Sequence, residues 1–171
     1  MHFASIKNFD IANGVGVRVS LFVSGCNHHC KECFNQEAWD FNYGEEFTDN
    51  EMNKIIDMLK PDYIKGLTLL GGEPMELVNQ KGILPLVKKV KELYPNKTIW
   101  CYSGFTFEQI MKMMEEWETT RELVKYFDVL VDGKFMIEKK DLSIKFRGSS
   151  NQRLIDFPKS LEKKEVVLLD I

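Results

Sequence analysis

Three short apolar segments recur in the middle of the chain about every 30 residues, the size of a βαβ unit. They have the composition of strands and lie at residues 67–70, 98–102 and 128–133, with a helical pattern between each pair. Neighbouring parallel strands need a crossover such as a helix between them. The alternation therefore predicts an α/β fold with a mainly parallel sheet.

The flanking sequence adds further strands to this sheet. At residues 15–23 every second residue is apolar, which is the alternation of a strand. Residues 147–158 are expected to form a loop rich in hydrogen-bonding groups, and residues 165–171 a terminal strand. No low-complexity segment or linker interrupts the pattern, so we expect residues 1–171 to form one domain.

Helix boundaries can be placed from short local signals. Thr48 and Glu51 have the spacing of a capping box, so a helix is expected to begin at Thr48. Pro61 ends it, because proline cannot continue a helix. Further helices are expected at residues 82–94 and from Thr106 onward.

Composition excludes several classes of partner. The 171 residues carry a formal net charge of −3, which gives no general attraction to nucleic acid or anionic lipid. No apolar run approaches the roughly 18 to 20 residues of a membrane span. The first ten residues have no basic region followed by an apolar run, so no signal peptide is expected. We therefore expect a cytoplasmic protein with reduced thiols and neither a nucleic-acid nor a membrane partner.

Polar or glycine-rich turns follow four of the expected strands. They lie at residues 24–26, 71–73, 103–104 and 132–134. In parallel α/β folds the ligand lies at the carboxyl ends of the strands. The four turns are therefore predicted to meet at one rim of the sheet and to form the functional site.

Three cysteines in the first of these turns have the spacing of a metal-binding loop. Cys26, Cys30 and Cys33 are arranged as CxxxCxxC, and thiolates select zinc, copper(I) or iron–sulfur clusters. A structural zinc site needs four ligands. His28 or His29 could supply the fourth, but the second hairpin that usually completes such a site is missing. A four-iron cluster held by three thiolates leaves one iron open to a substrate, and we favour this interpretation.

Cys101 is the alternative source of a fourth thiolate. It lies in the middle of the strand expected at residues 98–102. Free cysteine behaves as a small hydrophobic residue and is among the most buried residue types. Core packing is therefore favoured for Cys101, and the two histidines are expected to shape or cover the cysteine loop.

The cysteine motif and the sequence GGEP at residues 71–74 together resemble the radical S-adenosylmethionine superfamily. One position departs from that pattern: Glu32 precedes the third cysteine where many members have an aromatic residue, and Phe34 follows one place later. The segments GCNHHCKECFN, LTLLGGEPM, IWCYSGFTFE, VLVDGKF and FRGSSNQRLID are similar to the activating proteins of anaerobic ribonucleoside-triphosphate reductase. This similarity extends from Phe9 to Asp156.

The resemblance implies a particular chemistry. Members of this family are expected to hold a [4Fe–4S] cluster and S-adenosyl-L-methionine, and to cleave the latter reductively to a 5′-deoxyadenosyl radical. That radical takes a hydrogen atom from a glycine of the partner, anaerobic ribonucleoside-triphosphate reductase. The electron would come from a donor such as flavodoxin or ferredoxin. Since about 170 residues are few for a complete eight-unit barrel, we expect a partial, open radical-SAM β/α barrel of about five or six strands.

The second turn is predicted to contact the cofactor. Gly71 and Gly72 let a ligand approach the backbone closely, and Glu73 can accept a hydrogen bond from the methionyl amino group. The alternative is a plain tight turn before a helix.

The two later turns supply further cofactor contacts. The resemblance assigns Asp132 to the ribose hydroxyls and Lys134 to the methionyl carboxylate, and a lysine point charge suits the latter role. Ser103 would face the methionine or the ribose. The alternatives are a solvated turn for the first pair and an ordinary strand-to-helix turn for Ser103.

A dense set of hydrogen-bond donors follows near the end of the similar region: Arg147, Asn151, Gln152 and Arg153. Such side chains suit recognition of a peptide backbone, here the glycine loop of the partner. A helix cap with surface salt bridges is the alternative. For the whole chain, the competing hypotheses are a radical enzyme acting on a small molecule and a non-catalytic zinc module.

Overall fold

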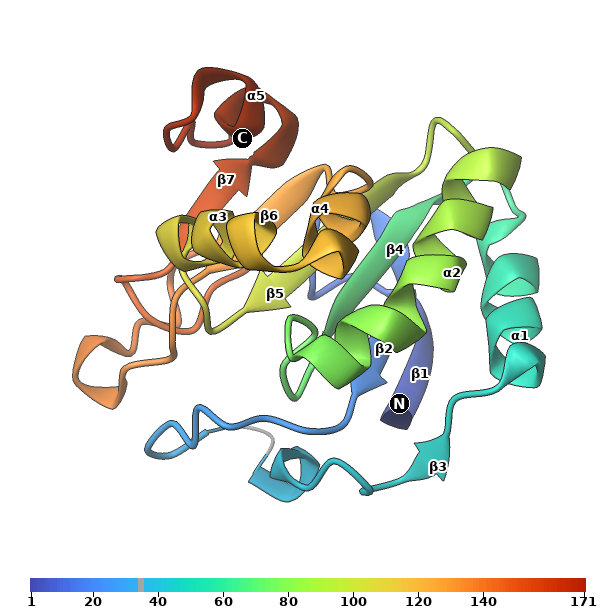
Figure 1. The fold of residues 1–171 in the computed structure, drawn as a ribbon, viewed down its shortest axis with the longest axis horizontal. Helices are drawn as coiled ribbons and strands as arrows, with labels where there is room; N and C mark the ends of the chain where they lie inside the picture. Colours follow the sequence, from blue (N-terminus) through green and yellow to red (C-terminus); the bar gives the residue numbers. More distant parts are fainter. Residues whose placement is uncertain (34–35) are drawn as a thin grey trace.

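A computed structural model describes residues 1–33 and 36–171, and Phe34, which the motif comparison singled out, lies outside these ranges. In the described part of the chain, one mixed seven-stranded sheet has the order β3-β1-β2-β4-β5-β6-β7 (Figure 1). The strands are β1 His2–Asp10, β2 Val17–Val23, β3 Glu45–Glu46, β4 Ile64–Gly71, β5 Thr98–Ser103, β6 Val129–Asp132 and β7 Arg153–Asp156.

The centre of this sheet is parallel, as predicted. β2, β4, β5 and β6 pair in parallel in that order, whereas β1, β3 and β7 are antiparallel to their neighbours. The sheet is open, with β3 and β7 at its edges. The prediction of an open α/β sheet is confirmed, but the expected five or six strands become seven because β1 and β3 were not foreseen.

The last strand also lies elsewhere than expected. β7 forms within the segment predicted to be a loop, because Leu154 and Ile155 are buried against β6. The expected terminal strand at residues 165–171 is reduced to one bridge between Leu168 and Ile155. Leu168 and Ile171 are exposed, and Val166 and Leu169 are only partly buried, so little apolar burial favours a regular strand here.

Five α-helices and two short 3₁₀ helices are present in residues 1–33 and 36–171. They are η1 Gln36–Trp39, α1 Asp49–Leu59, α2 Leu77–Leu93, α3 Phe107–Glu116, α4 Glu118–Val124, η2 Ile137–Lys139 and α5 Phe157–Lys163. The described helices include none long and apolar enough to cross a membrane.

The predicted helix starts are correct where a local cap defines them. The Thr48 amide donates to Glu51 Oε2 at 2.9 Å, and the Thr106 amide donates to Gln109 Oε1 at 2.8 Å. By contrast, α2 begins at Leu77, five positions before the predicted Gly82. Gly82 lies inside the helix, where a Cβ would approach Met1 Cβ to 2.6 Å.

The two faces of the sheet differ. Figure 1 shows α1, α2, α3 and α4 on the viewer's side of the sheet, where alternate strand residues such as Leu69 and Cys101 join the main hydrophobic core. Residues of opposite parity, including Trp100 and Val131, form a second cluster together with Phe146. Residues along each strand thus alternate between the two faces of the sheet, and the second face forms the floor of the cavity described next.

Candidate functional site

The carboxyl ends of β2, β4, β5 and β6 meet at one end of the sheet, as predicted. In Figure 1 the segment after β2 runs below this end, and the segment between β6 and β7 lies beside it. A cavity of about 610 Å³ opens between them. Ten predicted site residues line it: Cys26, Cys30, Cys33, Gly71, Gly72, Glu73, Ser103, Lys134, Arg147 and Gln152. Asp132, Asn151 and Arg153 line an adjoining hollow that shares Gly133 and Lys134 with the cavity.

The cysteine loop is held against the segment that follows it. The Gly25 amide donates to Ala38 O at 2.7 Å, and the Cys26 amide donates to Trp39 O at 3.1 Å. Cys26 is buried, whereas Cys30 and Cys33 are half-buried. All three face one cavity, although in the described residues no group of three His, Cys, Asp or Glu side chains is assembled closely enough to hold a metal ion.

Electrostatics at these thiols follow from burial. Burial raises the pKa of the Cys26 thiol to about 11, and the nearby Glu73 carboxylate adds to this effect. Burial and Cys33 raise the pKa of Cys30, which the positive charge of Lys134 opposes. Thiolates at these positions therefore need a compensating positive centre, and soft cations suit three sulfur donors.

The glycine pair is required by close packing of the chain on itself. Gly71 has φ +109°, and a Cβ there would lie 2.6 Å from Val23 O. A Cβ on Gly72 would lie 2.6 Å from Gly25 O. The Gly72 amide donates to Val23 O at 2.8 Å. Close packing thus accounts for both glycines, which also line the cavity, and their contact with the cofactor stays a prediction.

Glu73 is buried, and its carboxylate accepts hydrogen bonds from the protein itself. Oε1 accepts from His28 Nε2 and from the Gly104 amide, both at 2.7 Å. Oε2 accepts from the Met75 amide and from Ser103 Oγ, both at 2.8 Å. A carboxylate offers about four lone-pair sites, and these four hydrogen bonds occupy about that number. The contact of Glu73 with a methionyl amino group stays a prediction. The Ser103 hydroxyl donates its hydrogen bond to Glu73.

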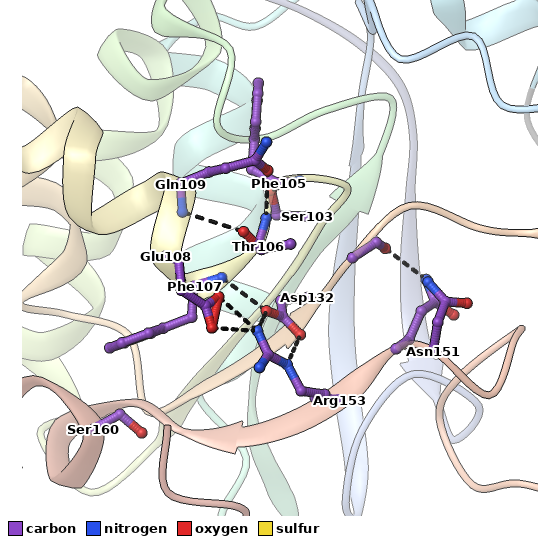
Figure 2. Close-up of polar contacts among 12 residues, drawn as sticks. Ser103, Phe105, Thr106, Phe107, Glu108, Gln109, Asp132, Asn151, Arg153 and Ser160 are labelled. Atoms are coloured by element: carbon purple, nitrogen blue, oxygen red, sulfur yellow. Dashed lines mark hydrogen bonds and ion pairs between the residues drawn. The ribbon is translucent and has the colours of Figure 1, made fainter. Parts of the chain in front are cut away.

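Asp132 and Arg153, predicted to serve different ligands, are paired with each other (Figure 2). The Asp132 side chain is 1% exposed. It accepts from Arg153 Nε at 3.0 Å, Arg153 Nη2 at 2.5 Å and the Phe107 amide at 2.7 Å. Arg153 Nη2 also lies 2.9 Å from Glu108 Oε2. For Arg153 the structure matches the salt-bridge alternative, and the ribose contact of Asp132 stays a prediction.

The remaining predicted donors shape the wall between β6 and β7. Asn151 Nδ2 donates to Lys134 O at 2.8 Å, and Gln152 Nε2 donates to Gly133 O at 3.0 Å. Gln152 Oε1 accepts from the Gly148 amide at 2.8 Å. These bonds fix the loop that carries Lys134 and Arg147 into the cavity wall.

Among the cavity residues that the sequence analysis missed, two have a buried polar atom without a hydrogen-bond partner in the part of the chain that the structure describes. The buried side-chain polar atoms without a hydrogen-bond partner in the described structure are Trp39 Nε1, Asn79 Oδ1 and Tyr102 Oη. Trp39 and Tyr102 line the cavity. Strand alternation could have indicated Tyr102, since Cys101 beside it is fully buried in the main core, as predicted.

Comparisons with known proteins show the family to which the chain belongs. Residues 12–155 match the family described as a 4Fe-4S single cluster domain, which defines the class as an iron–sulfur protein. Three relatives are named anaerobic ribonucleoside-triphosphate reductase-activating protein. The one from Haemophilus influenzae is 42% identical over 89% of this chain and 96% of its own length. That from Enterobacteria phage T4 is 41% identical, covering 90% and 93%, and that from Escherichia coli K12 is 38% identical, covering 89% and 96%.

The chain therefore belongs to the family of anaerobic ribonucleoside-triphosphate reductase-activating proteins. The resemblance inferred from the motifs is confirmed.

Proposed function

We propose that this protein is an iron–sulfur activase that uses S-adenosylmethionine to generate a glycyl radical on anaerobic ribonucleoside-triphosphate reductase. Family membership supports the activase function, the [4Fe–4S] cluster and the use of S-adenosylmethionine. The observation that carries the proposal is the single cavity that joins the three motif cysteines to the ends of four strands.

Cys26, Cys30 and Cys33 would hold the cluster, because they are three soft donors on one cavity wall. One-electron reductive cleavage of S-adenosylmethionine is the chemistry that such a cluster would supply when bound, and the resulting radical would take a hydrogen atom from the partner glycine. Lys134, already within electrostatic reach of Cys30, would hold the methionyl carboxylate. Apolar cavity residues such as Val131 and Phe146 would exclude water from the radical.

The partner would enter along the loop between β6 and β7. Leu142 is 81% exposed, and both Leu142 and Arg147 line the cavity, which supports contact with a polypeptide at this point. On this proposal the chain is a single radical-SAM domain whose partial barrel the reductase completes. The electron donor would be a flavodoxin or ferredoxin in the cytoplasm.

The test is anaerobic incubation of the iron-loaded protein with S-adenosylmethionine, a reductant and the reductase, followed by electron paramagnetic resonance. A stable glycyl radical on the reductase is expected, and it should be absent when Cys30→Ala replaces the wild type. A colourless protein with one zinc would contradict the proposal. Cleavage of S-adenosylmethionine with no radical on the reductase would instead favour a small-molecule substrate.

A further inference from the structure

One buried carboxylate connects separate parts of the cavity wall. Glu73 follows β4 and accepts hydrogen bonds from His28 in the cysteine loop, from Ser103 at the end of β5 and Gly104 just after it, and from Met75 before α2. The Glu73 side chain is 1% exposed. Charge-assisted hydrogen bonds are strong in such surroundings, so the carboxylate fixes these parts relative to one another.

His28 is the cysteine-loop residue in this arrangement, and its position is defined from several sides. It lies between Cys26 and Cys30, and Nε2 is 2.7 Å from Glu73 Oε1. The ring packs edge-on against Phe105, with 4.5 Å between the centroids. A Cβ on Gly104 would lie 2.6 Å from His28 Cδ2, so glycine leaves the space that the ring fills.

We propose that His28 is a positioning residue for the cluster: the His28–Glu73 pair anchors the cysteine loop to the sheet. The proposal rests on the proposed function, since it takes the flanking cysteines as cluster ligands. A loop whose thiolates must converge loses conformational entropy when it binds the metal centre. Anchoring the middle of that loop before the cluster binds reduces this entropy loss, as hydrogen bonds to metal-ligating residues do in general.

His29 provides a matched control within the same loop. It is exposed, and its ring stacks on Trp39 at 4.3 Å with an interplanar angle of 6°, away from Glu73. His28→Phe keeps an aromatic ring but removes the N–H donor. His28→Gln places an amide N–H the same number of bonds from Cα and can restore the hydrogen bond to Glu73.

The experiment measures how fast iron passes from the anaerobically loaded protein to an added chelator. We expect His28→Phe to release iron about tenfold faster than wild type, the usual effect of losing an outer contact to a metal ligand. His28→Gln should recover most of the wild-type rate, and His29→Phe should stay within about twofold of it. Thermal unfolding of the metal-free variants checks that each one folds.

Two further variants keep the test decisive. Gly104→Ala should also speed iron release, because the added methyl group displaces the His28 ring although both His28 and Glu73 are still present. This variant replaces His28→Phe if His28→Phe does not fold. The double variant Glu73→Gln/His28→Phe should release iron no faster than the faster of its two single variants. Equal rates for His28→Phe and His29→Phe, or no recovery with His28→Gln, would overturn the inference. A wild-type protein that takes up no iron would overturn the proposed function instead.

Discussion

At the scale of single residues, the carboxylates and cations near the rim are mostly held by the chain itself. Glu73 and Asp132 each accept hydrogen bonds from separate elements, and Arg153 is bound to Asp132. In the described residues, cavity side chains with a buried polar atom that has no hydrogen-bond partner are instead Trp39 and Tyr102, neither of which was predicted as a site residue. Several charged residues at the rim are therefore occupied within the chain, whereas Trp39 and Tyr102 each present a buried polar atom at the cavity wall.

Replacing cysteines should separate ligands from core packing. Cys30→Ala is expected to abolish iron binding, measured by iron analysis and visible absorption after anaerobic loading. Cys101→Ala should bind a full complement of iron and lose only about 1 kcal/mol of unfolding free energy, because a small buried volume is removed. Loss of iron in the Cys101 variant would show that this thiol reaches the cluster after all.

The buried Arg18 is predicted to matter for stability. It is 1% exposed, its burial lowers its pKa to about 10, and it donates to Thr68 Oγ1 at 2.9 Å and to Thr98 O at 2.8 Å. Arg18→Met leaves these acceptors unpaired and should cost about 3 kcal/mol or more of unfolding free energy in urea. The exposed Arg121→Met serves as the control, and an equal loss in both would contradict the assignment.

At the scale of elements, β7 and α3 are joined through one side-chain group. Asp132 at the end of β6 binds the α3 backbone through the Phe107 amide and binds β7 through Arg153 (Figure 2). The adjacent α3 cap at Thr106 and Gln109 is a separate, local signal. The antiparallel edge strand is thus fixed by a tertiary ion pair as well as by the sheet.

Arg153→Gln should loosen this edge and change its response to acid. Removing the charged partner of Asp132 is expected to lower the unfolding free energy by about 2 kcal/mol at pH 7. The hydrogen bond from Arg153 lowers the pKa of Glu108 in the folded protein. Glu108 therefore stabilises the fold above its unfolded-state pKa, and this stabilisation is lost as pH falls through its folded-state pKa. Urea unfolding between pH 7 and pH 3 should therefore show a shallower acid loss for the variant than for wild type.

At the scale of the whole molecule, the cavity is built from segments that lie far apart in the sequence. The cysteine loop, the ends of the parallel strands and the loop between β6 and β7 all meet at one end of the sheet (Figure 1). The helices α1 to α4 cover the opposite face of the strands. A partner that reaches the cavity must therefore contact the loops rather than α1 or α2.

Hydrogen–deuterium exchange can locate that contact. Binding of the reductase is expected to slow amide exchange in residues 134–152, which include the exposed Leu142 and the cavity residue Arg147. The helix α1 packs away from the cavity and serves as the internal reference. Protection of α1 without protection of residues 134–152 would place the partner elsewhere.

Sequence reasoning succeeded where the signal is local. The capping pair at Thr48 defined one helix start, and the recurrence of short apolar segments about every 30 residues placed the parallel centre of the sheet. It failed at β1, where only Phe3 and Asp10 are buried and pairing with β2 and β3 makes the strand. It also could not foresee that Glu73 would bind His28, because that contact spans 45 positions and depends on tertiary structure.

The open sheet has a consequence for how this protein behaves at high concentration. Its two outer strands are short: Glu45–Glu46 is acidic throughout, and Arg153–Asp156 begins and ends on a charged residue. Short, charged edge strands discourage intermolecular strand pairing between molecules of this protein. An unclosed sheet can thus remain accessible to a large protein substrate without becoming a template for fibrous self-association.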